Sequence, residues 1–219
     1  YLSKIIYHSS PIKSLINGVA KAIEYIVIKS PLPRLWDDGA KRAMSKAVTQ
    51  GKEADEPFFM FINLMDAHTP HAPTRGYNRT LHSVPYSWSS ESFDFWDVRG
   101  KNAAEAVDVK YFRQLYSASI EYMDRVVGSY IQQIRKVTER ETTVILTSDH
   151  GEELGEGDKL SHFGHVGSLS EALLHVPLLI FNPPSDGLVN ERKYVTHLDM
   201  GKLITGLATG SVPDISRNK

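Results

Sequence analysis

The fold is decided by residues 143–152, which read TVILTSDHGE. The apolar, β-branched run Val144-Ile145-Leu146 predicts a buried strand. Asp149 and His150 follow this strand closely, and ligands of open α/β sheets bind beyond the carboxyl ends of the strands. A carboxylate oxygen and an imidazole nitrogen at such a place suit a divalent cation. The alternative is structural: Asp149 would cap a turn and His150 would be a buried, hydrogen-bonded residue.

Histidines also follow a second predicted strand and occupy the loop after this motif. Residues 58–65 form a nearly continuous apolar run, typical of a parallel strand covered on both faces. His68 and His71 come next, in a proline-containing turn, and His162 and His165 lie in the later loop. A histidine at a strand end can protonate or stabilise a developing alkoxide. The alternative for each of them is an ordinary polar loop residue.

The remaining pattern alternates helices with strands. Helices are predicted over residues 12–26, 38–50, 102–138, 169–174 and 199–207, and strands over 58–65, 143–147 and 177–181. This alternation favours an α/β fold with a mostly parallel sheet flanked by helices. The irregular, aromatic-rich stretch 68–102 either packs on the domain or contributes to substrate recognition. The basic helix over 12–26 is expected to pack on the rest, with a membrane-surface role as the alternative.

Four segments, in order, resemble the sulfatase family of the alkaline-phosphatase-like superfamily. They are 56–70, with the sequence EPFFMFINLMDAHTP, 143–152, 168–178, with the sequence SLSEALLHVPL, and 196–208. The resemblance runs from Lys52 to about Pro213 and corresponds to the middle and C-terminal portion of a sulfatase. It implies an alkaline-phosphatase-like α/β fold and metal-dependent hydrolysis of a sulfate ester. The metal would be divalent, with Ca²⁺ favoured and Mg²⁺, Mn²⁺ and Zn²⁺ left open.

The resemblance also implies roles for five side chains. Asp149 and His150 would be the metal ligands. His68 would be catalytic, through a hydrogen bond to the sulfate or to the leaving oxygen, and His71 beside it would bind substrate. His165 lies near the place where many sulfatases have a lysine that contacts the transferred group, so His165 is predicted to be catalytic as well. Independently of the resemblance, glutamates 152 and 153 either orient His150, as carboxylates next to a metal ligand commonly do, or are solvated.

One element of the sulfatase pattern has no counterpart in this sequence. Sulfatases carry a Cys- or Ser-x-Pro-x-Arg nucleophile that becomes formylglycine, whereas this chain has no cysteine. The segment of this chain most similar to that motif is Ser9-Ser10-Pro11-Ile12-Lys13, which fits the N-terminus of a helix better. Formylglycine is therefore expected outside this chain. Residues 1–51 would be a helical segment from the middle of a longer catalytic domain, 52–219 its C-terminal part, and the fragment alone is expected to be inactive.

Composition narrows the classes of partner. The 219 residues, 41% of them hydrophobic, can bury one α/β core, and a net charge of −1 provides no field that would recruit nucleic acid. No apolar run approaches the roughly 18 residues of a membrane span. The absence of cysteine excludes disulfides and slightly favours a soluble, cytoplasmic location. The expected partner is a small-molecule or glycan sulfate or phosphate ester.

Two other functions remain open at this point. The first is a phosphodiesterase, phosphonate hydrolase or phosphoglycerol transferase of the same superfamily, for which two metal ions about 3.5–4 Å apart would be typical. The second is a truncated, non-catalytic domain that only binds a partner or an anion.

Overall fold

The structure is a computed structural model. It describes residues 39–71, 83–85, 107–138, 140–155, 163–165, 168–183 and 195–211, with isolated positions at 19, 22, 88 and 90. Apart from those isolated positions, the predicted helix over 12–26, the segment 9–13, His162 and most of the stretch 68–102 lie outside the described residues.

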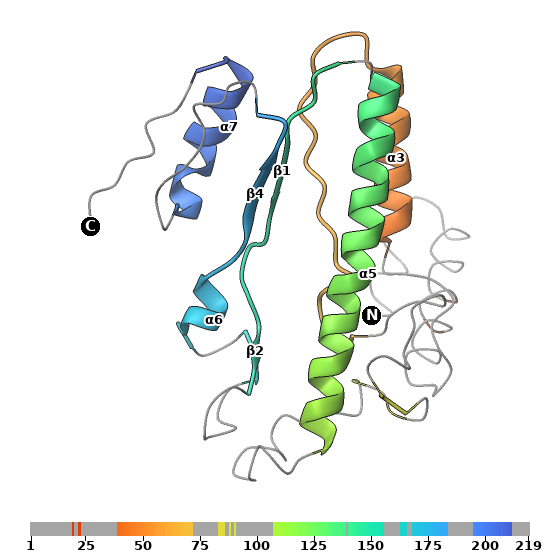
Figure 1. The fold of residues 1–219 in the computed structure, drawn as a ribbon, viewed down its shortest axis with the longest axis vertical. Helices are drawn as coiled ribbons and strands as arrows, with labels where there is room; N and C mark the ends of the chain where they lie inside the picture. Colours follow the sequence, from red (N-terminus) through yellow and green to blue (C-terminus); the bar gives the residue numbers. More distant parts are fainter. Residues whose placement is uncertain are drawn as a thin grey trace.

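Two helices pack side by side and provide the main apolar core (Figure 1). They are α3, Ala40–Glu53, and α5, Val107–Thr138, and they confirm the helices predicted over 38–50 and 102–138. Small side chains such as Ala40 and Ala47 on α3 let the two backbones approach closely, and larger ones such as Val126 and Ile134 on α5 fill the interface.

The segment over 58–65 runs extended beside α5 but is not a strand of a sheet (Figure 1). Its side chains alternate as an extended chain requires: Met60, Ile62 and Leu64 pack against the helix pair. Phe59 and Phe61 point the other way and are 72% and 81% exposed. The predicted strand covered on both faces is therefore wrong, because the helix pair covers only one face of this segment.

The described strands form two small antiparallel pairs. Strand β1, Val144–Thr147, pairs with β4, Leu178–Phe181, and strand β2, Glu153–Leu154, pairs with β3, Phe163–Gly164. The predicted mostly parallel sheet is not found among the described strands. Side chains on β4 alternate between half-buried and exposed, and such one-sided coverage is typical of antiparallel pairing.

Three short helical elements complete the described fold. Helix α6, Glu171–Leu174, precedes β4, and the 3₁₀ turn η5, His197–Asp199, leads into α7, Met200–Ala208, as the sequence predicted. A capping box joins Thr196 and Asp199 at the start of this turn, where the Thr196 amide donates to the Asp199 carboxylate over 3.3 Å. Helix α7 lies on the side of the β1–β4 pair away from α5 (Figure 1). No described helix combines the length and the apolar composition that a bilayer crossing requires.

Candidate functional site

The candidate site begins where β1 ends, in a loop shaped by its own polar groups. The Ser148 hydroxyl donates to the carbonyl of His150 over 2.6 Å, and the His150 amide donates to Oδ1 of Asp149 over 3.0 Å. Partial burial raises the pKa of Asp149, but the nearby His150 and the hydrogen bonds from the backbone and Ser148 outweigh this effect. The net pKa of Asp149 is therefore lowered, and its carboxylate, 87% exposed, is an anion available to a ligand.

The loop is held against α6 through Gly151. The Gly151 amide donates to the carbonyl of Leu173 over 2.8 Å. A Cβ at this position would lie 1.9 Å from the carbonyl oxygen of Ala172, which is far inside van der Waals contact. Only glycine fits this close approach of two backbones, so Gly151 fixes where Asp149 and His150 are presented.

Hydrogen bonds to backbone carbonyls also determine which imidazole nitrogen is available. Nδ1 of His150 lies 2.8 Å from the carbonyl of Gly151, and Nδ1 of His68 lies 2.6 Å from the carbonyl of Thr69. A carbonyl oxygen only accepts hydrogen bonds, so each Nδ1 carries the proton. In the neutral rings Nε2 then has a free lone pair, which is the arrangement of a metal-binding histidine.

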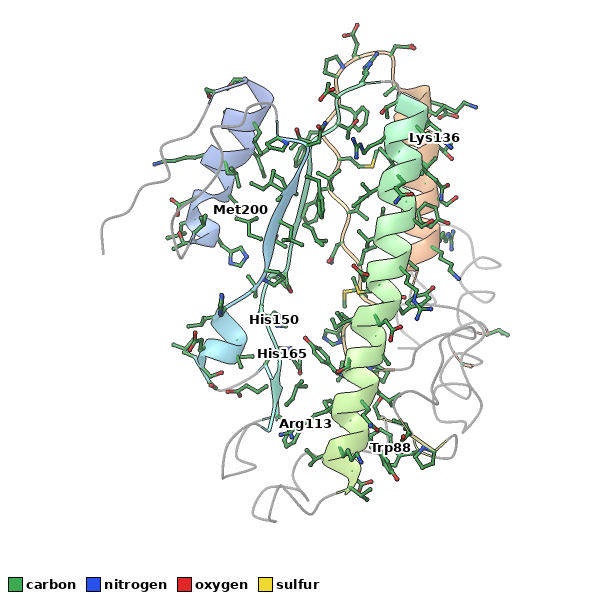
Figure 2. The ribbon with its side chains drawn as sticks, in the orientation of Figure 1. Trp88, Arg113, Lys136, His150, His165 and Met200 are labelled. Atoms are coloured by element: carbon green, nitrogen blue, oxygen red, sulfur yellow. The ribbon has the colours of Figure 1, made fainter. Side chains whose placement is uncertain are left out.

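Three predicted site histidines come together from separate segments. The ring of His165 lies 4.4 Å from that of His150 and 5.5 Å from that of His68, measured between centroids. Figure 2 shows His150 and His165 close together between α6 and α5. Upstream of His68, the carboxylate of Asp66 accepts a hydrogen bond of 3.2 Å from the Ala40 amide at the start of α3, which anchors this turn.

Glu152 joins this group through His165. Its Oε2 lies 3.3 Å from Nδ1 of His165, and its side chain is only 7% exposed. Its Oε1 is buried and has no hydrogen-bond partner among the described residues. One donor atom each from His150, Glu152 and His165 lie within 4.8 Å of one another, a spacing that can hold a metal ion. The expectation that Glu152 orients His150 is corrected, because the carboxylate contacts His165 instead. Glu153 accepts a hydrogen bond of 2.8 Å from the Ser168 hydroxyl.

His71 occupies a different environment from the other predicted site residues. It is 1% exposed, and its ring packs edge-on against Phe112 and Tyr116 with centroids 5.0 and 5.2 Å away. In the part of the chain that the structure describes, neither ring nitrogen has a hydrogen-bond partner, and Ser90 donates to the carbonyl of His71 over 3.0 Å. These surroundings favour a packing role, and the predicted contact of His71 with substrate stays a prediction.

The burial of His71 leads to a pH dependence of stability. Burial, and secondarily the nearby His68, lower the pKa of His71 from 6.5 to about 4. The unfolded chain then binds more protons than the folded one between these values, so stability falls as the pH drops from about 6.5 towards 4. Urea unfolding at pH 8 and pH 5 should show that His71 contributes about 2 kcal/mol to this loss.

The matching variant is His71→Phe, which cannot take up the proton. Between pH 8 and pH 5 this variant should lose about 2 kcal/mol less stability than the wild type. The control is Gln132→Ala, at an exposed position of α5 without a titratable group, which should keep the wild-type pH dependence. An equal pH dependence in wild type and His71→Phe would contradict the assignment.

Two contacts that the sequence did not predict support the site. Nε2 of His197, which was expected to be merely structural, lies 2.8 Å from the carbonyl of Ser148 and ties η5 to the loop. The guanidinium of Arg113 on α5 donates to the carbonyls of Leu154, over 2.7 Å, and of Gly155. Figure 2 shows Arg113 on the side of α5 that faces β2. The position of Arg113 next to the apolar stripe of its helix is the sequence feature from which this contact could have been suspected.

Comparison with known proteins identifies the family. A family model described as Sulfatase matches residues 17–211. The chain is 27% identical over 190 residues to the uncharacterized sulfatase YidJ of Escherichia coli, a match that covers 80% of this chain and 37% of that protein. It is 25% identical over 184 residues to human iduronate 2-sulfatase, covering 72% and 32%, and 26% identical over 196 residues to bovine arylsulfatase K, covering 78% and 36%.

The chain thus spans about a third of the length of these curated relatives. No solved structure matches it. The family implies an alkaline-phosphatase-like α/β fold and a hydrolase, as the resemblance suggested. With most of its residues matched by the family model, the chain belongs to the sulfatase family.

Proposed function

We propose that this chain supplies the metal-binding and leaving-group side of the active site of a sulfuric ester hydrolase. The observation that carries the proposal is the convergence of His68, His150 and His165 beside Asp149, at the carboxyl end of β1. Relatives named as iduronate 2-sulfatase and arylsulfatase support a sulfate ester of a small molecule or glycan as substrate.

In this proposal Asp149 and His150 bind the divalent cation, with Ca²⁺ favoured. Asp149 fits because its carboxylate is exposed and its pKa is lowered, and His150 fits because its Nε2 lone pair is free. The cation supplies positive charge for the oxygens of the bound ester. Formylglycine is expected outside this chain, so the nucleophilic attack is not assigned to any residue here.

His68 and His165 serve the leaving group in this proposal. Hydrolysis builds negative charge on the oxygen of the departing alcohol, and an imidazolium nearby can stabilise or protonate it. Because Nδ1 of His68 is committed to the Thr69 carbonyl, the transferable proton of His68 would be on Nε2. Glu152 holds Nδ1 of His165 in a similar way.

The test is hydrolysis of 4-nitrophenyl sulfate by the protein encoded by the complete reading frame that contains these residues. Asp149→Asn keeps the side-chain size but removes the anionic ligand, so kcat/KM should fall about a hundredfold. The control is Asp124→Asn, an exposed carboxylate on α5, which should leave kcat/KM unchanged. Full activity of Asp149→Asn would overturn the assignment of the ligand.

The phosphoester alternative is tested with the same preparation. The histidine-rich surroundings of Asp149 would also suit a phosphodiesterase or phosphonate hydrolase of the superfamily. Hydrolysis of bis(4-nitrophenyl) phosphate without hydrolysis of the sulfate, together with two bound ions per protein, would favour that alternative. A reading frame without a Cys- or Ser-x-Pro-x-Arg segment would exclude the formylglycine mechanism.

A further inference from the structure

We infer that His150, Glu152 and His165 form a binding site for a transition-metal cation of the Zn²⁺ class. These donors differ from the Asp149–His150 pair of the proposed function. They share His150 with it, and because His150 has a single free ring nitrogen, the two donor sets are alternative positions for one cation. The inference deepens that function, since it names a second donor set in the same region. It rests on three observations: the backbone pairing that brings the donors together, an unpaired buried oxygen, and the chemistry of the donors.

Strand pairing places Glu152 and His165 opposite each other. In the β2–β3 pair Glu153 is opposite Gly164, so the next position of the antiparallel register sets Glu152 against His165. Gly164 has a φ of +86°, in the left-handed region that favours glycine, and this turns the chain immediately before His165. The two donors are thus placed by backbone structure, and their 3.3 Å contact is a consequence of it.

The buried carboxylate has an oxygen that nothing in the described structure satisfies. Oε1 of Glu152 has no hydrogen-bond partner, although the side chain is only 7% exposed. A buried, unpaired carboxylate oxygen is costly. A cation bound between Glu152 and the two imidazoles would remove this cost.

The spacing of the donors suits a small cation after a modest contraction. Zn²⁺ binds nitrogen and oxygen at about 2.0–2.2 Å, so neighbouring donors in a tetrahedron lie about 3.4 Å apart. The contact between Nδ1 of His165 and Glu152 already has this length, at 3.3 Å, and all three donor atoms lie within 4.8 Å of one another. A cation bound there would displace the proton that Nδ1 of His165 shares with Glu152. His150 offers Nε2, because its Nδ1 donates to the Gly151 carbonyl.

The donor set selects the class of cation. Two imidazoles and one carboxylate match the ligands that proteins use for Zn²⁺, Co²⁺ or Fe²⁺. Ca²⁺ requires six to eight oxygen ligands, and this set offers a single carboxylate. The site should therefore bind Zn²⁺ more tightly than Ca²⁺, whereas a site centred on Asp149 favours the harder ion.

The test is calorimetric titration of the metal-free full chain with Zn²⁺ and, separately, with Ca²⁺. We expect Zn²⁺ to bind, and Glu152→Gln and His165→Asn each to weaken that binding about a hundredfold, the upper end of what metal-site substitutions cost. Ca²⁺ affinity should stay the same in Glu152→Gln. Circular dichroism checks that each variant is folded. His165 is half-buried, so His165→Asn should disturb the packing less than Glu152→Gln does.

The matched control is Glu171→Gln, which removes the carboxylate of another histidine–glutamate contact. Glu171 and His175 lie 3.8 Å apart on the exposed side of α6, so this variant should keep wild-type Zn²⁺ affinity. Absence of Zn²⁺ binding to the wild type, or Zn²⁺ affinity within threefold of wild type in both Glu152→Gln and His165→Asn, would overturn the inference. These outcomes are separate from the sulfatase assignment, which is tested by hydrolysis in the Asp149→Asn variant.

Discussion

Replacing Gly151 with alanine is expected to lower the free energy of unfolding by about 4 kcal/mol, from forced overpacking and a lost backbone hydrogen bond. The added Cβ would lie 1.9 Å from the carbonyl oxygen of Ala172, so the loop must move away from α6. That movement breaks the 2.8 Å hydrogen bond from Gly151 to Leu173. Because Asp149 and His150 directly precede Gly151, the same movement should displace both metal ligands.

Urea unfolding followed by circular dichroism measures the loss of stability, and metal titration measures the displacement of the ligands. Gly128→Ala is the matched control, since no described residue lies within 4 Å of a Cβ at that position of α5. In a helix interior alanine is favoured over glycine, so Gly128→Ala should be neutral or slightly stabilising. A Gly151→Ala variant with wild-type stability would contradict the described packing of the loop on α6.

Replacing Phe112 with alanine is expected to lower the free energy of unfolding by about 3–5 kcal/mol. Phe112 is fully buried in α5, and its ring packs edge-on against His71 and Phe163, with centroids 5.0 and 6.0 Å away. The substitution leaves a cavity between the helix, the turn after His68 and the β2–β3 pair. Elements that position the site would therefore lose their common support.

The measurement is again urea unfolding, with Ile120→Ala as the control. Ile120 is an exposed apolar residue of the same helix, so its truncation should change the stability by no more than about 0.5 kcal/mol. Similar losses in the two variants would show that Phe112 is not part of a packed core.

The helices were predictable from the sequence because their buried residues repeat at helical spacing. The stripe that includes Phe112 and Ile134 identified α5. The surroundings of the extended segment over 58–65 were harder to predict. The apolar run over 58–65 gave no indication that one of its faces would be left open, because an apolar run alone does not show what covers it.

The candidate site was predictable in its members but not in their contacts. His68, His150 and His165 each follow a recognisable segment, and the structure brings them together. The contact of Glu152 with His165 depends on the register of β2 and β3, two-residue strands with no periodic signal. The burial of His71 could not be foreseen either, because it depends on side chains of a helix far along the chain.

The two backbone contacts of the loop after β1 link cation binding to the folding of the C-terminal third of the chain. The Gly151 amide holds the loop to α6, and the side chain of His197 holds the Ser148 carbonyl to η5, which leads into α7. Each contact requires both partners to be in their native positions. A cation that binds only the folded loop therefore stabilises all of these segments at once, by about 2.7 kcal/mol when its concentration is a hundred times its Kd. In this region ligand affinity and conformational stability are two expressions of a single equilibrium.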